Sequence, residues 1–276
     1  MPNHTSILKL ADGTDLHLTA WLPEGEPRGV MLLSHGLAEH AGRYHHVAAA
    51  FNARGYAVYA PDHRGHGRSG GLRAYFADFD QPVTDFQRVY DHARSAHPAH
   101  KPFIYGHSLG SLIALSFCLR HSQALAGAII TGTPLAVESA TSPLLAALAP
   151  VLSALIPTMP VAPLGDDGIS RDPAVVAAYR NDPLVYQGNV RARMANHILQ
   201  ASRRIKARAA ELSLPLLILH GAADPICPAA GSAELYQRAG SADKTLKIYP
   251  ELYHEIHNEP EQTAVLDDVL AWLDAH

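Results

Sequence analysis

Two stretches of the chain contain glycine frames that are associated with catalysis or with cofactor binding. Residues 61–71 read PDHRGHGRSGG, which holds both a G-x-G-x-x-G dinucleotide fingerprint and, around Ser69, the G-x-S-x-G frame of a nucleophilic serine. A second G-x-S-x-G frame spans residues 106–110 around Ser108. The sequence therefore offers three candidate sites, one for hydride transfer and two for attack by a serine hydroxyl.

The context of residues 61–71 argues against both of their motifs. A dinucleotide fingerprint must follow its strand almost directly and open a helix, because the pyrophosphate sits on the N-terminus of that helix. Residues 61–64 intervene after the preceding apolar run, and the residues after Gly70 do not begin a helix. Ser69 lacks a strand-to-helix elbow for the same reason. We expect a conformationally demanding loop near the site, and no nicotinamide, flavin or other cofactor.

Ser108 lies where a nucleophile elbow requires it. The apolar run 103–105 leads into Gly106, and residues 109–119 continue with a helical pattern. Glycines are needed at 106 and 110 because the elbow is strained and crowded, so a side chain there would clash with neighbouring backbone. The N-terminus of the helix also favours negative charge near the serine. Ser108 is therefore the predicted nucleophile.

The acid of a catalytic triad is expected downstream of Ser108. A serine hydroxyl needs a base to remove its proton, and the base needs an acid to hold its tautomer. With a strand-to-helix elbow the chain order is serine, acid, histidine, and the acid follows a late strand. Asp224 comes just after the apolar run 215–219. We predict that Asp224 is this acid, against the alternative that it only caps a turn or a helix.

Three histidines compete for the role of base. His254 and His257 both follow the apolar run 245–249, and His107 directly precedes the nucleophile. Neighbouring residues of an extended segment project to opposite sides, so the imidazole of His107 should not reach Ser108. His254 comes first in its loop and is the predicted base. Activity should then fall as His254 is protonated, near its reference pKa of about 6.5 or below.

A serine hydrolase also needs backbone donors for the oxyanion. One comes from the residue after the nucleophile and the other from the loop after an earlier strand. The segment SHGL at residues 34–37 follows the apolar run 29–33. We predict that the backbone amides of Leu37 and Leu109 are the two donors.

The elements around these residues alternate between strand and helix. A hairpin is predicted over residues 6–10 and 14–21, around Asp12-Gly13. Apolar runs typical of buried parallel strands follow at 29–33, 56–60, 102–105, 126–131, 215–219 and 245–249. Helical patterns occur at 44–52, 82–96, 109–121, 232–238 and 261–274. This alternation predicts an α/β fold with a mostly parallel, doubly wound sheet of about eight strands.

Residues 134–213 interrupt the alternation. No strand-like run appears there, and residues 139–165 contain no charged side chain. Five prolines break this apolar stretch, whereas a membrane span needs an uninterrupted helix of about 20 residues. We therefore predict a core domain of residues 1–133 and 214–276, with an inserted cap at residues 134–213.

Two interpretations of the apolar stretch in the cap stay open, and they are compatible with each other. In the first, a helix packs on the core through four leucines, Leu144, Leu148, Leu152 and Leu155. In the second, the apolar underside of the cap covers a ligand, or its outer face makes transient contact with lipid.

Composition and short motifs exclude several classes of function. With 47% hydrophobic and 17% charged residues, the 276-residue chain is typical of a folded globular enzyme. Its net charge of −4 and the lack of a basic stripe argue against a nucleic-acid partner. The segment HEIH at residues 254–257 is one residue short of the zincin motif, so we expect no metal. Two distant cysteines and no signal-peptide pattern predict a cytoplasmic protein.

Six short segments, in order along the chain, carry a family resemblance. They are SHGLAEHAGRY (34–44), PDHRGHGRSGG (61–71), FIYGHSLGS (103–111), RNDPLVY (180–186), LHGAADPIC (219–227) and KTLKIYPELYHEIHNEP (244–260). Together they resemble the monoacylglycerol lipase and lysophospholipase-like serine hydrolases of the α/β-hydrolase fold. The resemblance implies a cofactor-free enzyme that cleaves a lipid ester, with monoacylglycerol as the first expectation. The alternative is a broader carboxylesterase or lysophospholipase with the same triad.

The resemblance also implies roles for individual residues. The family's triad falls on Ser108, Asp224 and His254. Its polar contacts to the glycerol head fall on four residues, Glu39, Arg43, Tyr179 and His257. Without the resemblance, Glu39 and Arg43 would be interpreted as a surface ion pair.

The chain departs from the family pattern at several positions. Leu37 is larger than the small residue often found after His-Gly, and Ser111 replaces a glycine that often follows the elbow. Outside RNDPLVY the cap matches poorly, so the acyl-chain preference does not follow from the resemblance. Cys227 lies where some relatives carry a thiol-sensitive cysteine, and reactivity there would require a lowered thiol pKa.

Overall fold

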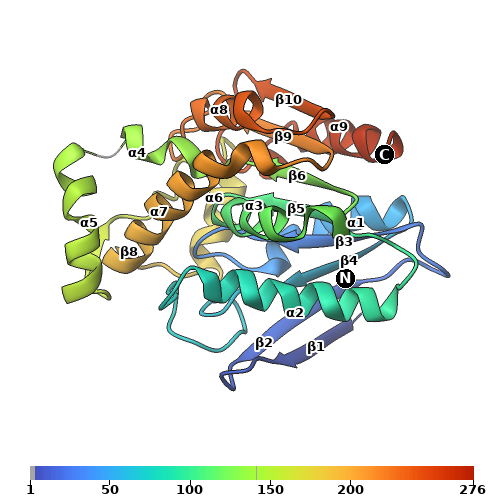
Figure 1. The fold of residues 1–276 in the computed structure, drawn as a ribbon, viewed down its shortest axis with the longest axis horizontal. Coiled ribbons are helices and arrows are strands. Elements are labelled where there is room, and N and C mark those ends of the chain that lie inside the picture. Colours follow the sequence, from blue (N-terminus) through green and yellow to red (C-terminus); the bar gives the residue numbers. More distant parts are fainter. Residues whose placement is uncertain (1–3, 141) are drawn as a thin grey trace.

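The structure is a computed structural model that describes residues 4–140 and 142–276 of the chain. An eight-stranded sheet forms its centre, with the strand order β1-β2-β4-β3-β5-β6-β9-β10 (Figure 1). In chain order these strands are β1 (His4–Lys9), β2 (Asp15–Trp21), β3 (Gly29–Ser34), β4 (Tyr56–Pro61), β5 (Phe103–His107), β6 (Gly127–Thr131), β9 (Leu216–Gly221) and β10 (Lys244–Tyr249). The pairs β1–β2 and β2–β4 are antiparallel and the other neighbouring pairs are parallel. The predicted mostly parallel sheet with an initial hairpin is confirmed.

Burial along the strands depends on their place in the sheet. Every residue of β3, β4, β5, β6 and β9 is buried. The prediction of a fully buried strand is wrong for β10, where Thr245 and Lys247 are exposed. The physical reason is that β10 lies at the edge of the sheet and has a neighbour only in β9.

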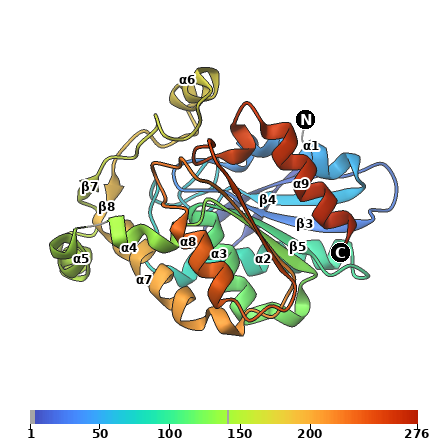
Figure 2. The same ribbon diagram turned by 90° about the horizontal axis from the view of Figure 1, so that it is seen from above.

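Helices cover both faces of the sheet. One face carries α1 (His45–Ala53) and α9 (Gln262–Asp274), and the other carries α2 (Asp80–Ala96), α3 (Leu109–His121) and α8 (Ala230–Arg238) (Figure 2). Alternate residues of β3 point into the two layers: Val30 and Leu32 belong to one buried cluster, Met31 and Leu33 to the other. The five helices predicted around the sheet are confirmed to within two residues at each end.

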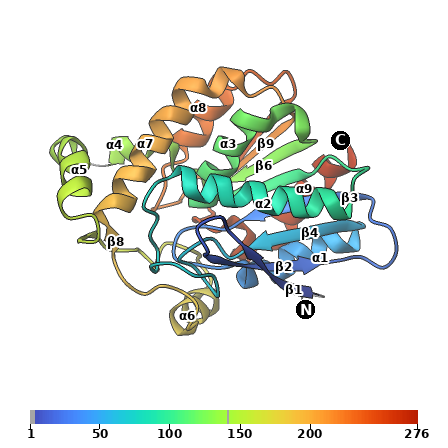
Figure 3. The ribbon, with the colours of Figure 1, turned by 60° about the horizontal axis from the view of Figure 1, so that its bottom comes forward.

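Residues 134–213 supply most of the structure at one end of the sheet (Figure 3). Their helices are α4 (Val137–Ala140), α5 (Pro143–Leu155), α6 (Pro173–Asn181) and α7 (Ala192–Arg208). The prediction of no strand in this region is wrong, because β7 (Pro160–Ala162) and β8 (Val190–Arg191) pair antiparallel. The short 3₁₀ turns of the chain are η1 (Ala41–Tyr44), η2 (Ser122–Ala124), η3 (Pro134–Ala136), η4 (Ala209–Glu211) and η5 (Ile256–Asn258).

The helix α5 lies away from the sheet and contacts α7 (Figures 1 and 2). The interpretation that four leucines of α5 pack on the core is wrong for three of them. Leu144, Leu148 and Leu155 are 72%, 43% and 76% exposed. Leu152 is the exception and faces the cavity described below. Within residues 4–140 and 142–276, no helix has the length and apolar character needed to cross a membrane.

Candidate active site

Ser108 occupies a sharp turn between β5 and α3. Its φ of +52° and ψ of −123° lie in a region that residues with side chains rarely adopt. A Cβ at Gly106 would lie 2.9 Å from the carbonyl oxygen of Gly110, and a Cβ at Gly110 would lie 2.1 Å from that of Ser34. The expected steric need for glycine at both positions is confirmed. The turn presents the serine at the carboxyl end of β5, where it lines a cavity.

The structure brings the three predicted catalytic side chains into one hydrogen-bonded line. His254 Nε2 lies 2.9 Å from Ser108 Oγ, and His254 Nδ1 lies 2.7 Å from Asp224 Oδ2. Asp224 follows the end of β9, and His254 lies in the loop after β10, so two neighbouring parallel strands deliver the acid and the base. In this geometry Nδ1 donates to the carboxylate and Nε2 accepts from the hydroxyl.

The electrostatics of the pair suit a base that must accept a proton. Burial disfavours the ionised carboxylate, but the charge of His254 and hydrogen bonds from His220 and from the amide of Cys227 outweigh it, so the pKa of Asp224 lies well below its ordinary value. Burial also disfavours the imidazolium, yet Asp224 outweighs this and raises the pKa of His254 above its ordinary value. The expectation that the pKa of His254 lies at or below about 6.5 is wrong, because that reference value does not include the effect of the buried Asp224 carboxylate.

The other two histidines lie apart from the nucleophile. His107 Nδ1 is 3.0 Å from the hydroxyl of Thr131, and burial first, then the nearby His254, holds the pKa of His107 well below its ordinary value. His257 is fully buried and stacks on Tyr44 with ring centroids 4.8 Å apart. Burial lowers the pKa of His257 to about 3. His257 does not line the cavity, so its side chain does not reach a ligand there in this structure.

The loop after β3 runs against the nucleophile, where an oxyanion hole is expected. A Cβ at Gly36 would lie 2.7 Å from Glu39 Oε1 and 3.3 Å from the Cβ of Ser108, so a side chain there would push against both residues. Leu37 and Leu109 both line the cavity, and Leu109 is the first residue of α3, whose first-turn amides have no partner within the helix. Ala38, which follows Leu37 in the loop, has a φ of +70°. The loop thus holds a strained conformation beside Ser108.

Residues 134–213, the segment predicted from the sequence to be a cap, are hydrogen-bonded to both loops of the site. The amide of Tyr186 donates to the carbonyl of Ala38, at 2.8 Å, next to the predicted oxyanion donor. The amide of Glu255 donates to the carbonyl of Ile169, also at 2.8 Å, next to the base. His40 Nε2 lies 2.8 Å from Asp182 Oδ2. These bonds hold the segment around α6 in a defined position beside the two loops.

A cavity of about 450 Å³ opens beside Ser108 and is mostly apolar. Cap residues supply much of its wall, and these are Pro134, Val137, Ala149, Leu152, Val161, Ala162, Pro163, Leu164, Gly165, Ile169, Tyr179, Val190, Ala192, Ala195, Ile198 and Leu199. The polar wall comes from Glu39, Tyr179 and Glu255, together with the imidazoles of His107 and His254. The arrangement can hold an ester with a long apolar arm and a small polar head.

A buried charge network forms the polar wall. Arg43 Nη1 lies 2.6 Å from Glu39 and 2.6 Å from one oxygen of Glu255, while Nη2 lies 2.7 Å from the other oxygen. The guanidinium also stacks 4.7 Å above the ring of Tyr179. Glu39 accepts two more bonds, from the amide of Gly36 and the hydroxyl of Tyr44. The interpretation of Glu39 and Arg43 as a surface pair is wrong, because both side chains are at most 10% exposed.

The pKa values of the two carboxyls in this network shift in opposite directions. Burial raises the pKa of Glu39 above its ordinary value, although Arg43 opposes it. Burial acts on Glu255 in the same sense, but the bidentate contact with Arg43 outweighs it and lowers the pKa of Glu255. Arg43 itself does not line the cavity, so it supports the two carboxylates from behind.

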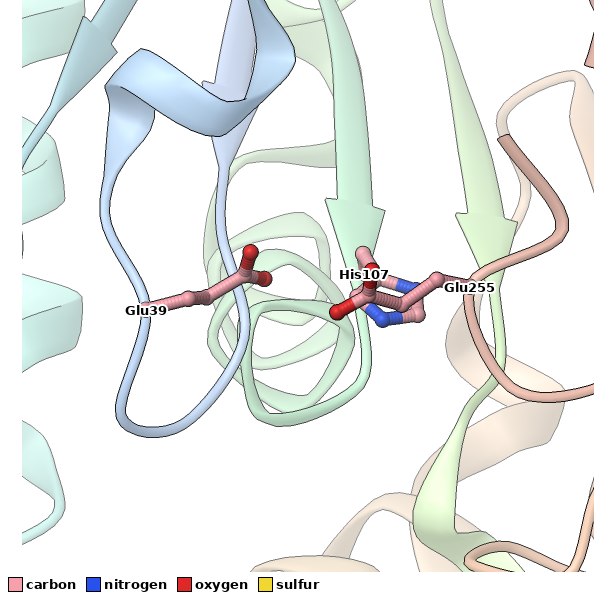
Figure 4. A group of neighbouring side chains, drawn as sticks. All are labelled: Glu39, His107 and Glu255. Atoms are coloured by element: carbon pink, nitrogen blue, oxygen red, sulfur yellow. The ribbon is translucent and has the colours of Figure 1, made fainter. Parts of the chain in front are cut away.

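The side chains of Glu39, His107 and Glu255 point toward one another from three separate segments (Figure 4). One possible ligand atom from each lies within 4.8 Å of the others, which is close enough for a metal ion. However, Arg43 already forms ion pairs with both carboxylates, and the imidazole of His107 is hydrogen-bonded to Thr131. The group therefore fits a guanidinium rather than a metal ion.

The loop of residues 61–71 has a structural role behind the site. Gly65, Gly67 and Gly71 have φ values of +71°, +49° and +108°, which confirms the expectation of a conformationally demanding loop. The hydroxyl of Ser69 donates to the carbonyl of Asp62. The side chain of Asp62 in turn accepts from the amide of Ala41, in the loop that carries Glu39. No residue of the loop lines the cavity.

Cys227 lies in the cavity wall but has the environment of an inert thiol. It is buried, and burial together with the charge of Asp224 raises the pKa of its thiol well above the ordinary value. A reactive thiol would need a lowered pKa, whereas the pKa of Cys227 is raised. The amide of Cys227 donates to Asp224 Oδ1, at 2.9 Å.

Two buried residues of the site were missed from the sequence. Glu255 was considered only as part of the HEIH segment, and its partner Arg43 is 212 residues away in the chain. His220, which directly follows the apolar run 215–219, was given no role, although it contacts Asp224. A polar residue at the end of an otherwise apolar strand is the signal that could have identified it.

Comparisons with known proteins find similar chains. The Hydrolase_4 family, described as serine aminopeptidase S33, matches residues 25–261. The chain is 45% identical over 264 residues to a monoacylglycerol lipase of Mycolicibacterium smegmatis, covering 96% of this chain and 94% of that protein. It is 34% identical to the monoglyceride lipase of Homo sapiens, covering 95% and 88%. The solved structure of Paleococcus ferrophilus monoacylglycerol lipase is similar with a TM-score of 0.86 at 30% identity, covering 95% and 99%.

Proposed function

The chain belongs to the Hydrolase_4 (serine aminopeptidase, S33) family and has the α/β-hydrolase fold, and on this premise we propose that it hydrolyses monoacylglycerols to glycerol and fatty acid. The observation that carries the proposal is the hydrogen-bonded line of Ser108, His254 and Asp224 at the wall of a mostly apolar cavity. The similar proteins named above also support the proposal, because they are named monoacylglycerol lipase and monoglyceride lipase.

The proposed reaction proceeds through an acyl-enzyme. Ser108 Oγ attacks the ester carbonyl while His254 Nε2 takes its proton, and the imidazolium formed is stabilised by Asp224. The amides of Leu37 and Leu109 bind the oxyanion, and loss of one such donor costs about 10²- to 10³-fold in rate. His254 then gives the proton to the leaving glycerol oxygen. Water, activated by the same imidazole, releases the fatty acid and restores Ser108.

The polar wall is proposed to hold the glycerol head. Glu39 accepts hydrogen bonds from glycerol hydroxyls, and the hydroxyl of Tyr179 contacts the same head, since both residues line the cavity near Ser108. Arg43 and His257 act from behind the wall, Arg43 by fixing the carboxylates and His257 by packing against Tyr44. The apolar wall from the cap holds the acyl chain.

Charge in the cavity favours a neutral head over an anionic one. The lining includes the carboxylates of Glu39 and Glu255 and, among the described residues, no lysine or arginine. Placing like charges together costs several kcal/mol, so a phosphate head should be rejected. This distinguishes a monoacylglycerol lipase from a lysophospholipase with the same triad, whereas a broader carboxylesterase is distinguished by its activity on esters without a glycerol head.

A substrate panel tests the proposal. We expect the highest kcat/KM for 1-monooleoylglycerol, a lower value for ethyl oleate, and a value at least about 100-fold lower for lysophosphatidate. Tyr179→Phe should lower kcat/KM for the glyceride by roughly 3- to 10-fold, the effect of one lost hydrogen bond, and leave ethyl oleate unchanged. Tyr186→Phe, on the same segment but outside the cavity lining, is the matched control. Equal rates across the panel would support the broader esterase instead.

We also propose that the outer face of α5 touches the lipid surface from which the substrate comes. Its exposed apolar side chains continue into the following turn and comprise Leu144, Leu148, Val151, Leu155, Ile156 and Met159. No charged residue interrupts them. In flotation with phosphatidylcholine vesicles, the variant with Leu144→Asp and Leu155→Asp should bind less than the wild-type protein. Equal binding would contradict this contact.

A further inference from the structure

A second histidine contacts the proposed catalytic acid. His220, the residue before the end of β9, places Nε2 at 3.0 Å from Asp224 Oδ2, the same oxygen that His254 Nδ1 approaches to 2.7 Å. The other oxygen, Oδ1, accepts from the amides of Ile226 and Cys227 at 2.8 and 2.9 Å. The carboxylate therefore has four donors and no exposed surface.

The hydrogen bonds of His220 determine its tautomer. Nε2 faces two acceptors, Asp224 Oδ2 and the carbonyl oxygen of Cys227 at 2.9 Å, so Nε2 carries the proton. Nδ1 lies 2.6 Å from the hydroxyl of Ser232 in α8 and accepts a hydrogen bond from it. The side chains of His220 and Ser232 are completely buried. A single hydrogen-bonded chain thus runs from Ser232 through His220 and Asp224 to His254.

This chain is distinct from the ligand-binding wall. Neither His220 nor Ser232 lines the cavity, so neither reaches a substrate. A fully buried imidazole costs stability if it has no polar partners. The position of His220 between Ser232 and Asp224 is explained if its function is to act on the carboxylate.

We propose that His220 is a positioning residue of the triad, which donates from Nε2 to Asp224, is held in that tautomer by Ser232, and thereby fixes the carboxylate and shares its negative charge. The inference rests on the proposed serine hydrolase function but not on the identity of the substrate head. It applies to any ester that Ser108 attacks.

The direction of the effect follows from the charge on Oδ2. With His220 in place, the negative charge of Asp224 is divided between two N–H donors. Without it, the carboxylate interacts more strongly with the imidazolium of His254, and the positive end of the His220 N–H dipole no longer opposes that imidazolium. Both changes stabilise protonated His254. The acid limb of kcat/KM should therefore move to higher pH when His220 loses its N–H.

Other groups that face His254 remain unchanged in this comparison. Asp224, Glu255 and Glu39 are the carboxylates that favour its protonated form. His107 of β5 places its ring 4.7 Å from that of His254 and stays neutral, because burial lowers its pKa. A shift of the acid limb can then be assigned to the substituted residue.

The test compares His220→Leu with His220→Gln, whose side-chain amide keeps an N–H near the position of Nε2. The pH dependence of kcat/KM is measured with 4-nitrophenyl butyrate, an ester without a glycerol head. If the wild-type protein did not hydrolyse this ester, the proposed function would fail, and this result is distinct from failure of the present inference. A melting curve of each variant checks folding. Titration of the ¹⁵N-labelled His254 ring by NMR gives a second readout that is independent of turnover.

We expect His220→Leu to shift the acid limb upward by about half to one pH unit, the equivalent of one lost hydrogen bond, and to lower kcat with little change in KM. His220→Gln should restore most of the wild-type profile. Ser232→Ala keeps both imidazoles and should give a smaller shift of the same sign, so it carries the test if His220→Leu does not fold. A folded His220→Leu or Ser232→Ala whose acid limb and His254 titration match the wild type overturns the proposal, as does an equal shift in His220→Gln and His220→Leu.

Discussion

Replacing Arg43 by methionine should destabilise the fold far more than the loss of an ordinary ion pair. Its guanidinium contacts Glu39 and both oxygens of Glu255 at 2.6 to 2.7 Å, and its side chain is only 10% exposed. Methionine is also unbranched and fills much of the same space. The substitution leaves two buried carboxylates without a cation, with possible ligand atoms within 4.8 Å of each other.

The expected magnitude follows from these uncovered charges. Removing one partner of a buried ion pair costs about 3–5 kcal/mol, and here one substitution uncovers two carboxylates. A whole protein of this kind is stable by only about 5–15 kcal/mol. The carboxylates respond by binding protons, which raises their folded-state pKa above the unfolded value. A raised folded-state pKa gives stability at low pH that is lost as the pH rises, so the deficit of Arg43→Met should shrink as the pH falls.

Urea unfolding followed by tryptophan fluorescence measures this deficit between about pH 8 and about pH 5, where the carboxyls of the variant take up protons. The matched control is Arg180→Met, which removes an exposed guanidinium that pairs with Asp166 and Asp167. We expect no measurable change in the control, because exposed pairs contribute little. The reasoning is refuted if Arg43→Met unfolds at the wild-type urea concentration, or if its deficit stays constant or grows as the pH falls.

Three further outcomes are expected from the site. Gly110→Ala should abolish folding or activity because its Cβ would lie 2.1 Å from a backbone oxygen, whereas Gly165→Ala, with no atom within 4 Å of the added Cβ, should leave the melting temperature unchanged. The rate should fall on acidification with an apparent pKa above about 6.5, because Asp224 raises the pKa of His254; a limb below that value contradicts the geometry. N-Ethylmaleimide should leave activity intact near neutral pH, because Cys227 is buried and its pKa is raised; rapid inactivation that Cys227→Ser prevents would disprove this.

Local signals in the sequence were sufficient for the sheet and for the proposed triad. Each buried parallel strand appears as a short apolar run, and the elbow around Ser108 combines a strand, two glycines and a helix within about twenty residues. Asp224 and His254 could be placed because parallel strands deliver their carboxyl ends to the same edge of the sheet. Chain order then specified which acid and which histidine meet the serine.

The same local signals could not predict contacts between residues far apart in the chain. The sequence does not show that Arg43 closes on Glu255, because that pair depends on how two loops meet across the sheet. The direction of the His254 pKa required the distance and burial of Asp224. The leucines of α5 have the spacing of a core-facing helix, but α5 packs on α7 at the end of the molecule, and this leaves most of them exposed.

The central claim is that Ser108 is the nucleophile that carries the acyl group. Treating the protein with an alkyl fluorophosphonate and mapping the labelled peptide by mass spectrometry tests it most directly. The account predicts one label per chain, on the peptide that contains Ser108, with no labelling and no ester hydrolysis in Ser108→Ala. Labelling at another residue, or full hydrolysis by Ser108→Ala, would contradict it.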